Sequence, residues 1–160
     1  MKVELKDGSE FEVKEMVSIL EIAKQISEGL ARNACCGIVD GEVKDLRYEL
    51  KKDAKLEIAT FENSIEGKKA YWHTTSHIMA QAIKRLYPNI KLTIGPAIDN
   101  GFYYDFDTDK PFTPEMLEVI EGEMKKIIKE DLVIRRFTLP KQEAINLMKE
   151  RKEDYKVELI

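Results

Sequence analysis

The 160-residue sequence has few of the residues that mark several large protein classes. Its two cysteines, Cys35 and Cys36, are adjacent, which is too close to bridge comfortably and the wrong spacing for a zinc knuckle. Free thiols in an apolar segment fit a reducing compartment. The net charge of −4 excludes a histone-like protein or a basic nucleic-acid arm. Any contact with RNA would need local patches or help from elsewhere.

Long apolar runs and nucleotide-binding loops are also missing. No segment approaches the roughly 18 apolar residues of a membrane span. Residues 2–15 alternate charged and apolar side chains, unlike a secretory signal peptide. The pattern Gly-x-x-x-x-Gly-Lys-Ser/Thr does not occur, which removes nucleotide hydrolysis by a P-loop. These absences predict a soluble, cytoplasmic protein. Its length of 160 residues suits one ordinary domain or two small ones.

The first sixty residues predict one compact unit. Apolar and charged side chains alternate on both sides of the Asp7-Gly8 turn, which indicates a hairpin. A helix should follow, with Ser18 as its N-cap, Glu21 as the capping-box partner and Gly29 at its C-terminal end. Further apolar strands are expected at residues 34–39 and 56–60. Two strands, a helix and further strands are the order of a β-grasp fold.

A second, longer helix is expected to begin just after this unit. Asn63 is a candidate N-cap, with Glu66 as its capping-box partner. The helix must end near Tyr87, because Pro88 disfavours helical backbone in the residue before it. Gly67 in the first turn is expected to cost stability and to let that turn fray.

This helix carries the only two histidines of the protein, His73 and His77, one helical turn apart. A helix that buries its apolar stripe would hold both imidazoles away from its own core and aim them at another element. The spacing alone is weak evidence, because a solvated polar face can carry two histidines by chance. The residues expected on the opposite, packed side are Thr75, Ile78, Met79, Ala82, Ile83 and Leu86.

Residues 91–106 predict a hairpin around Asn100-Gly101, the strongest short hairpin signal in the chain. Pro96 should then lie on an edge or at a bulge. Asp99 and Asn100 are interpreted as turn formers rather than catalysts.

The remaining residues predict a helix that begins with Thr113 as N-cap and Pro114 as its first residue. After it we expect a strand, an amphipathic helix and a final strand, over residues 133–137, 140–148 and 155–160. A strand as the last element, with no turn after it, suggests a chain cut within a domain.

Three segments together, residues 73–77, 95–106 and 155–157, resemble the N-terminal part of the bacterial-type threonyl-tRNA synthetase family. Residues 1–61 resemble its TGS domain, which is a β-grasp module. Residues 62–160 resemble most of its editing domain, in which helices pack on a mainly antiparallel sheet. The expected fold class is therefore α+β, with the second domain incomplete at its C-terminal end.

The resemblance implies an aminoacyl-tRNA synthetase whose editing domain hydrolyses serine mischarged onto threonine tRNA. A methyl group distinguishes the two amino acids by only about 1–3 kcal/mol, so a second, hydrolytic selection is needed. The expected partner is threonine tRNA, and the parent protein is expected to be a homodimer through a domain outside this chain. ATP with Mg²⁺, and a Zn²⁺ ion, are expected in the parent's catalytic domain, and no cofactor or metal is expected in this segment.

The resemblance also implies four catalytic residues: His73, His77, Tyr104 and Lys156. Imidazoles accept or donate protons near neutral pH, a lysine supplies positive charge or orients water, and a tyrosine donates a hydrogen bond. Lys156 could instead be an ordinary strand lysine, and Tyr104 an aromatic at the rim of the core. The family pairs the His-x-x-x-His helix with a later Cys-x-x-x-His segment. This sequence has no cysteine after Cys36 and no histidine after His77, so the chain alone is expected to be inactive or weakly active.

Two other functions remain open from the sequence. Two histidines one turn apart are a common ligand pair, which would suit a metal-dependent aminoacyl-tRNA hydrolase. A TGS domain also occurs in regulatory proteins, which would make the chain a non-catalytic RNA-binding module.

Overall fold

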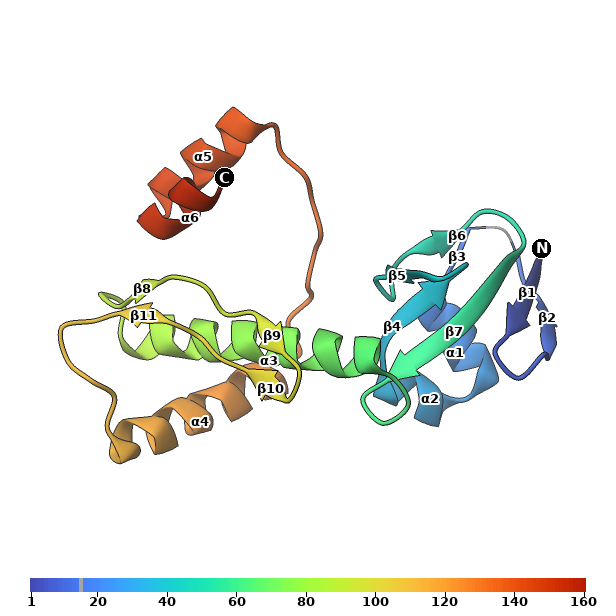
Figure 1. The fold of residues 1–160 in the computed structure, drawn as a ribbon, viewed down its shortest axis with the longest axis horizontal. Helices are drawn as coiled ribbons and strands as arrows, with labels where there is room; N and C mark the ends of the chain where they lie inside the picture. Colours follow the sequence, from blue (N-terminus) through green and yellow to red (C-terminus); the bar gives the residue numbers. More distant parts are fainter. Residues whose placement is uncertain (15) are drawn as a thin grey trace. The chain divides into compact units, whose positions relative to one another are not determined.

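The computed structural model describes residues 1–14 and 16–160, which divide into two compact units (Figure 1). The first unit is Met1–Trp72 and the second is His73–Ile160. Helix α3 (Ile65–Leu86) begins in the first unit and ends in the second.

The first unit is built on a five-stranded mixed sheet with the strand order β2-β1-β7-β4-β5. Strands β1 and β7 pair in parallel, and the other pairs are antiparallel. The core between this sheet and helix α1 (Ile19–Ile26) includes Val3, Ile22 and Leu56, which are almost fully buried. The strands are β1 (Lys2–Leu5), β2 (Glu10–Glu12), β4 (Ala34–Val39), β5 (Glu42–Lys44) and β7 (Ala54–Thr60), with a smaller pair, β3 (Val17–Ser18) and β6 (Glu49–Leu50). The sheet with its crossing helix confirms the β-grasp and the α+β class.

Helix α1 begins as predicted and ends earlier than predicted. The side chain of Ser18 accepts from the backbone N–H of Glu21, and the Glu21 carboxylate accepts from the backbone N–H of Ser18. The helix ends before Ser27, whose extended backbone starts a new helix, α2 (Glu28–Asn33). The Ser27 hydroxyl caps α2 by accepting from Leu30 N–H at 3.0 Å. Gly29 therefore lies inside α2, and its predicted place at the end of α1 is wrong.

The two cysteines lie on β4, where the strand register shifts between Ala34 and Cys36. Burial is the main reason that the pKa of the Cys36 thiol is raised to about 11, and the neighbouring Cys35 and Glu66 add to it. The thiol therefore stays protonated, as suits a small apolar core residue.

Helix α3 is capped one residue later than predicted. The Ser64 hydroxyl accepts from Gly67 N–H at 2.8 Å, so Ser64 is the N-cap. Asn63 instead closes the preceding turn, because its side chain accepts from Thr60 N–H at 2.8 Å and donates to the carbonyl of Ile58 at 3.1 Å. Asparagine and serine both cap helices well, so sequence alone could not choose between them.

Gly67 has a role that its helix propensity does not reveal. A Cβ atom at this position would lie 2.0 Å from the carbonyl oxygen of Thr60, well inside van der Waals contact. The first turn of α3 therefore packs backbone to backbone against the end of β7. The glycine permits a close contact that a side chain would prevent, and this contact favours an ordered first turn over the predicted fraying.

The second unit has its core between α3 and helix α4 (Pro114–Lys129). Thr113 caps α4 and Pro114 is its first residue, as predicted. The buried core residues are Ala82, Ile83, Ile90, Ile120 and Ile127. Three of the residues expected on the packed side of α3, namely Ile78, Met79 and Leu86, pack against this core.

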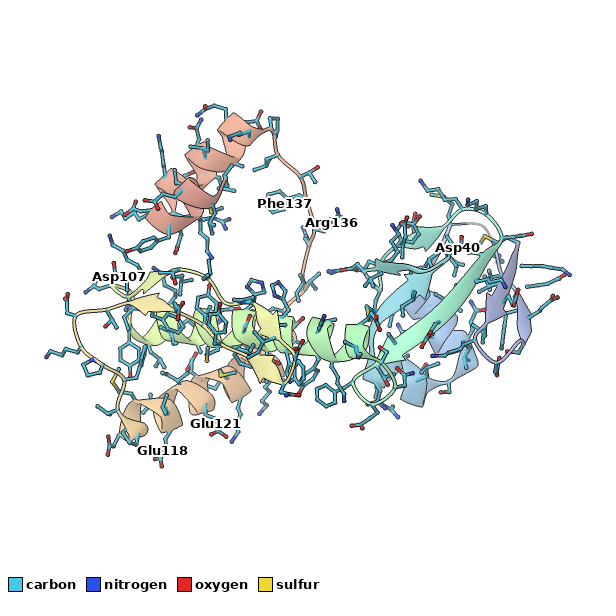
Figure 2. The ribbon with its side chains drawn as sticks, viewed as in Figure 1. Asp40, Asp107, Glu118, Glu121, Arg136 and Phe137 are labelled. Atoms are coloured by element: carbon cyan, nitrogen blue, oxygen red, sulfur yellow. The ribbon has the colours of Figure 1, made fainter. Side chains whose placement is uncertain are left out.

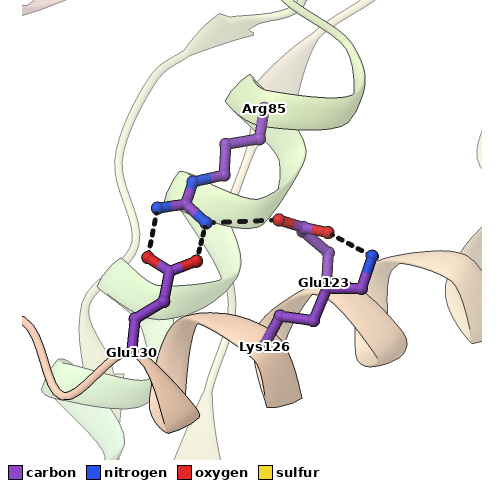
Figure 3. A network of polar contacts seen from close by, with 4 residues as sticks. All are labelled: Arg85, Glu123, Lys126 and Glu130. Carbon is purple, nitrogen blue, oxygen red and sulfur yellow. Dashed lines mark hydrogen bonds and ion pairs between the residues drawn. The ribbon is translucent and has the colours of Figure 1, made fainter.

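A polar network also joins these two helices (Figure 3). The Arg85 guanidinium donates to both carboxylate oxygens of Glu130, at 2.6 and 2.8 Å, and to Glu123 at 3.3 Å. Lys126 contacts the other oxygen of Glu123 at 3.0 Å. These bonds raise the pKa of Arg85 and lower those of Glu130 and Glu123. The charge-assisted fork adds geometric specificity to the apolar packing.

The predicted hairpin is present and is irregular in its middle. Strands β9 (Ala97–Ile98) and β10 (Gly101–Phe102) pair next to the turn, and β8 (Lys91–Leu92) pairs with β11 (Phe106–Asp107) farther away. Between these pairs, the four residues 93–96 lie opposite the three residues 103–105. The first arm therefore carries one extra residue, and Pro96 lies in this bulged segment, as predicted. The turn residues are Asp99 and Asn100, and Gly101 follows with a φ of 143°.

Two predicted strands near the C-terminus are wrong. Residues 133–137 form no strand, and every residue from 131 to 140 is exposed, including Val133 at 81 % and Phe137 at 63 %. Arg136 and Phe137 lie on this connection (Figure 2). High β propensity alone does not make a strand, and the sheets of the described residues do not include residues 133–137. Residues 155–160 belong mainly to a short helix, α6 (Asp154–Leu159), which packs against α5 (Lys141–Glu150). Six residues are too few to tell strand from helix by periodicity.

Among residues 1–14 and 16–160, no helix is both long enough and apolar enough to cross a membrane.

Candidate active site

The two histidines of α3 contact each other through their ring nitrogens. The Nε2 atoms of His73 and His77 are 3.0 Å apart, and the rings are perpendicular with centres 4.5 Å apart. One Nε2 must carry a proton and the other a lone pair for this hydrogen bond to form. Both side chains are exposed and lie away from the core residues of the helix, as their spacing predicts.

His77 is held in its neutral form. The surrounding protein lowers its pKa below the ordinary value of 6.5, mainly by desolvation, and the nearby His73 and Lys156 lower it further. A neutral imidazole at physiological pH is able to accept a proton.

Lys156 comes to the same place from α6. Its ammonium group donates to the carbonyl oxygen of Thr93 at 2.5 Å and lies 5.9 Å from the centre of the Tyr104 ring. Lys156 was expected on a strand and instead lies on a helix, yet it still reaches the neighbourhood of the histidines. A lysine has three donors, so the bond to Thr93 leaves two for other acceptors.

Tyr104 lies on the return arm of the hairpin and is half-buried. Its ring stacks on Phe106, with centres 4.7 Å apart and an angle of 17° between the planes. Burial is the main reason that its pKa is raised, and Glu153 raises it further. The phenol is therefore protonated at neutral pH and able to donate a hydrogen bond.

A series of polar contacts holds α6 against this part of the unit. Beside Lys156, the phenol of Tyr155 donates to a carboxylate oxygen of Asp107 at 2.9 Å. The adjacent residues make two ion pairs: Asp154 with Lys91 and Glu153 with Lys84, both at 3.3 Å. Three consecutive residues thus place Lys156.

Two residues absent from the predicted set connect its members. Ser76 is fully buried, and its hydroxyl lies 2.8 Å from the carbonyl oxygen of His73 and 3.0 Å from that of Gly95. A Cβ atom on Gly95 would lie 2.1 Å from Cδ2 of Tyr104, so the tyrosine ring lies directly on this glycine. In the sequence, Ser76 stands out only by its position between the two histidines. Helical periodicity does not predict which residue a small polar side chain contacts.

The four predicted site residues therefore come from three elements of the second unit: α3, the hairpin and α6. They offer a proton acceptor, a phenol donor and an ammonium group within one neighbourhood, which suits hydrolysis of an ester or amide. Within residues 1–14 and 16–160, no group of three or more His, Cys, Asp and Glu side chains is arranged to hold a metal ion.

Comparison with known proteins adds two findings. Residues 1–60 match the family described as "TGS domain". The first unit contains a TGS domain. The match ends one residue before the boundary expected at residue 61, and the second domain at residues 62–160 stays a prediction.

The whole chain is also similar to curated proteins named threonine–tRNA ligase. It is 62 % identical over its 160 residues to the protein of Acetivibrio thermocellus, 59 % to that of a Clostridium perfringens strain and 57 % to that of Caldanaerobacter subterraneus subsp. tengcongensis. In each case the entire chain is aligned and covers 24–25 % of the relative. The chain therefore spans about a quarter of the length of these relatives, and it resembles their N-terminal quarter.

Proposed function

We propose that this chain is the N-terminal region of a threonine–tRNA ligase and that the second unit carries half of an editing site. In this proposal the site hydrolyses serine wrongly esterified to threonine tRNA. The observation that carries the proposal is the meeting of the His73–His77 pair with Tyr104 and Lys156, in a chain that is similar along its whole length to such ligases.

The chemistry assigns a role to each residue type. Water attacks the carbonyl carbon of the seryl ester, forming a new C–O bond, and the bond from that carbon to the ribose oxygen breaks. Neutral His77 accepts the proton of the attacking water and returns it to the ribose oxygen, which leaves as a hydroxyl group. The serine carboxyl group then loses its proton to solvent. His73 orients His77 through the hydrogen bond between their Nε2 atoms.

Tyr104 and Lys156 supply the electrostatic part. As the carbonyl oxygen becomes negative, the Tyr104 phenol and the Lys156 ammonium group are the donors able to stabilise it or to hold the serine hydroxyl. The raised pKa of Tyr104 keeps its proton available for this.

The proposal extends to the whole protein. The relatives are named as ligases that join threonine to tRNA, so we expect the full-length protein to perform that reaction in the cytoplasm with ATP and Mg²⁺. Threonine tRNA would be its partner, and a homodimer its assembly. The expected Zn²⁺ would bind outside these 160 residues.

A deacylation assay tests the editing role. Threonine tRNA charged with serine, and separately with threonine, is incubated with this chain and with the full-length Acetivibrio thermocellus relative. We expect this chain to release serine more slowly than the relative does and to spare threonine, because residues from a later segment would complete the site. Errors of about 1 Å in such positioning can cost roughly 10²-fold in rate.

Variants connect the activity to the site. In the full-length relative, alanine at the position that aligns with His77 should abolish serine release, whereas alanine at the position that aligns with exposed Thr74 of the same helix should not. Unchanged activity in the His77 variant would contradict the editing site. Binding of tRNA without any hydrolysis by either protein would instead favour a non-catalytic TGS module.

A further inference from the structure

Ser76 is the only fully buried polar or charged side chain among the described residues, and it lies between the two histidines in the sequence. Resting on the proposed function, we propose that Ser76 is a positioning residue. Through Gly95, it fixes the distance between the His73–His77 pair and the ring of Tyr104.

The first step of the argument concerns where the Ser76 proton goes. A hydroxyl has one proton, and two carbonyl oxygens lie within reach, that of His73 at 2.8 Å and that of Gly95 at 3.0 Å. The carbonyl of His73 already accepts the helical hydrogen bond from His77 N–H. Donation to Gly95 therefore adds a contact that the helix cannot supply for itself, and it joins α3 to the hairpin.

The second step concerns Gly95 itself. It lies in the bulged segment 93–96, where Asp105 accepts from Thr93 N–H and donates to the carbonyl of Ile94. Among the described backbone bonds of this segment none includes Gly95 itself, so the Ser76 hydroxyl supplies the polar contact of its carbonyl. Its Cα is covered by the Tyr104 ring: an added Cβ would meet Cδ2, Cε2 and Cγ of that ring at 2.1, 2.5 and 2.7 Å. Any movement of Gly95 relative to α3 must therefore move the tyrosine ring.

The third step leads from the ring to the ammonium group. Lys156 lies over the Tyr104 ring and bonds to Thr93, two residues before Gly95 in the same segment. Ser76 thus holds the segment on which both Tyr104 and Lys156 rest. The histidines lie on the same helix as Ser76, so one hydroxyl sets the geometry between the proton acceptor and both donors.

The arrangement predicts a spectroscopic signature in the unaltered protein. A proton that lies under the face of an aromatic ring is shifted upfield, so a Gly95 Hα resonance should be displaced and should return to its ordinary range in Tyr104→Leu. NOEs should also join Ser76 Hβ to Gly95 Hα. A Gly95 Hα resonance at its ordinary position in the unaltered protein would overturn the proposal without any variant of Ser76.

The main test is Ser76→Ala, with Thr74→Ala as the matched loss of a hydroxyl from an exposed position on the same helix. The chain has only two histidines, so both can be titrated by NMR without overlap. We expect the pKa of His77 in Ser76→Ala to rise toward its ordinary value, because the hairpin and Lys156 would move away from it. Ser76→Thr, which keeps the hydroxyl, should restore part of the effect, and Thr74→Ala should show none.

A second variant covers the case in which Ser76→Ala does not fold. Gly95→Ala leaves α3 intact and pushes the Tyr104 ring away, so it should shift the pKa of His77 in the same direction. A folded Ser76→Ala or Gly95→Ala with the ring shifts and the His77 pKa of the unaltered protein would overturn the proposal.

The activity readout separates this inference from the proposed function. In the full-length relative, the aligned Ser76→Ala should lower kcat for serine release by roughly 10- to 10²-fold with little change in KM. If the relative itself releases no serine, the proposed function fails. The NMR result on this chain would then still decide whether Ser76 positions Tyr104.

Discussion

The Nε2 atoms of His73 and His77 lie 3.0 Å apart, so the two rings share one hydrogen bond and one proton. Two protonated imidazoles could not keep this contact, because both facing nitrogens would be donors. The contact would therefore be lost if both rings were protonated.

Stability should fall on mild acidification because of His77. Its pKa in the folded protein lies below the ordinary value of 6.5, so the unfolded chain takes up a proton before the folded chain does. This contribution to the free energy of unfolding is complete above pH 6.5 and is lost as the pH falls through 6.5 toward the folded pKa. Urea unfolding between pH 5.5 and 7.5, about a unit to either side of that value, would measure it.

His77→Gln provides the control for this titration. It should flatten the pH dependence of the free energy of unfolding over the same range. The loss of stability from protonating carboxylates such as Glu123 and Glu130 occurs below their ordinary pKa of 4.5 and should remain. An unchanged slope in the variant would mean that His77 does not carry the effect.

Gly67→Ala should destabilise the first unit although alanine is the better helix former. The gain in helix propensity is about 1 kcal/mol, whereas forcing a methyl group into a packed contact costs typically about 1–3 kcal/mol. With the Cβ only 2.0 Å from the oxygen of Thr60, the cost should exceed the gain, by up to roughly 2 kcal/mol.

Gly122→Ala is the matched comparison, because a Cβ there has no neighbour within 4 Å. It should stabilise α4 by about 1 kcal/mol. Denaturant unfolding followed through resonances of each unit would measure both changes. Opposite signs are expected for the two changes in unfolding free energy, and two stabilising substitutions would show that the contact with Thr60 is not rigid.

The attachment of α6 should weaken with salt. Its contacts include two partly exposed ion pairs, Lys91 with Asp154 and Lys84 with Glu153, and the core cluster of the second unit contains no residue of α5 or α6. Screening at 1 M salt acts over about 3 Å, so hydrogen exchange of the α6 amides should accelerate. Lys91→Ala should have the same effect at low salt. Lys125→Ala, which removes an ion pair within α4, should leave α6 unchanged.

Arg85→Lys should lower the melting temperature of the second unit while keeping the charge. A lysine is unable to bond both oxygens of Glu130 and also reach Glu123, which Arg85 does with its fork. Thermal unfolding with Lys125→Ala as the comparison would measure the effect. A melting temperature equal to that of the unaltered protein would assign these bonds no role beyond surface charge.

The elements that the sequence predicted well are those whose local signals agree with one another. The Ser18 capping box, the Thr113-Pro114 helix start and the polar side of α3 each rest on two or more independent features. The faces of α3 followed from helical periodicity, which placed both histidines away from the core.

The features that the sequence missed depend on partners far along the chain. Residues 133–137 have the composition of a strand but join none of the described sheets, whereas residues 155–159 fold with α5. The roles of Gly67 and Ser76 depend on what lies opposite them, Thr60 and Gly95, and no local pattern identifies those contacts.

The unequal arms of the hairpin, four residues opposite three, have a further consequence. Thr93 and Ile94 share one partner, because Asp105 accepts from Thr93 N–H and donates to the Ile94 carbonyl, so the bulge takes up the extra residue. Ala97 therefore still pairs with Phe102, as Leu92 pairs with Phe106. Deleting one residue from 93–96 would remove the bulge and redirect the Gly95 carbonyl that now meets Ser76. A substitution in this segment changes one side chain, whereas a change in its length would re-aim the backbone on which the site rests.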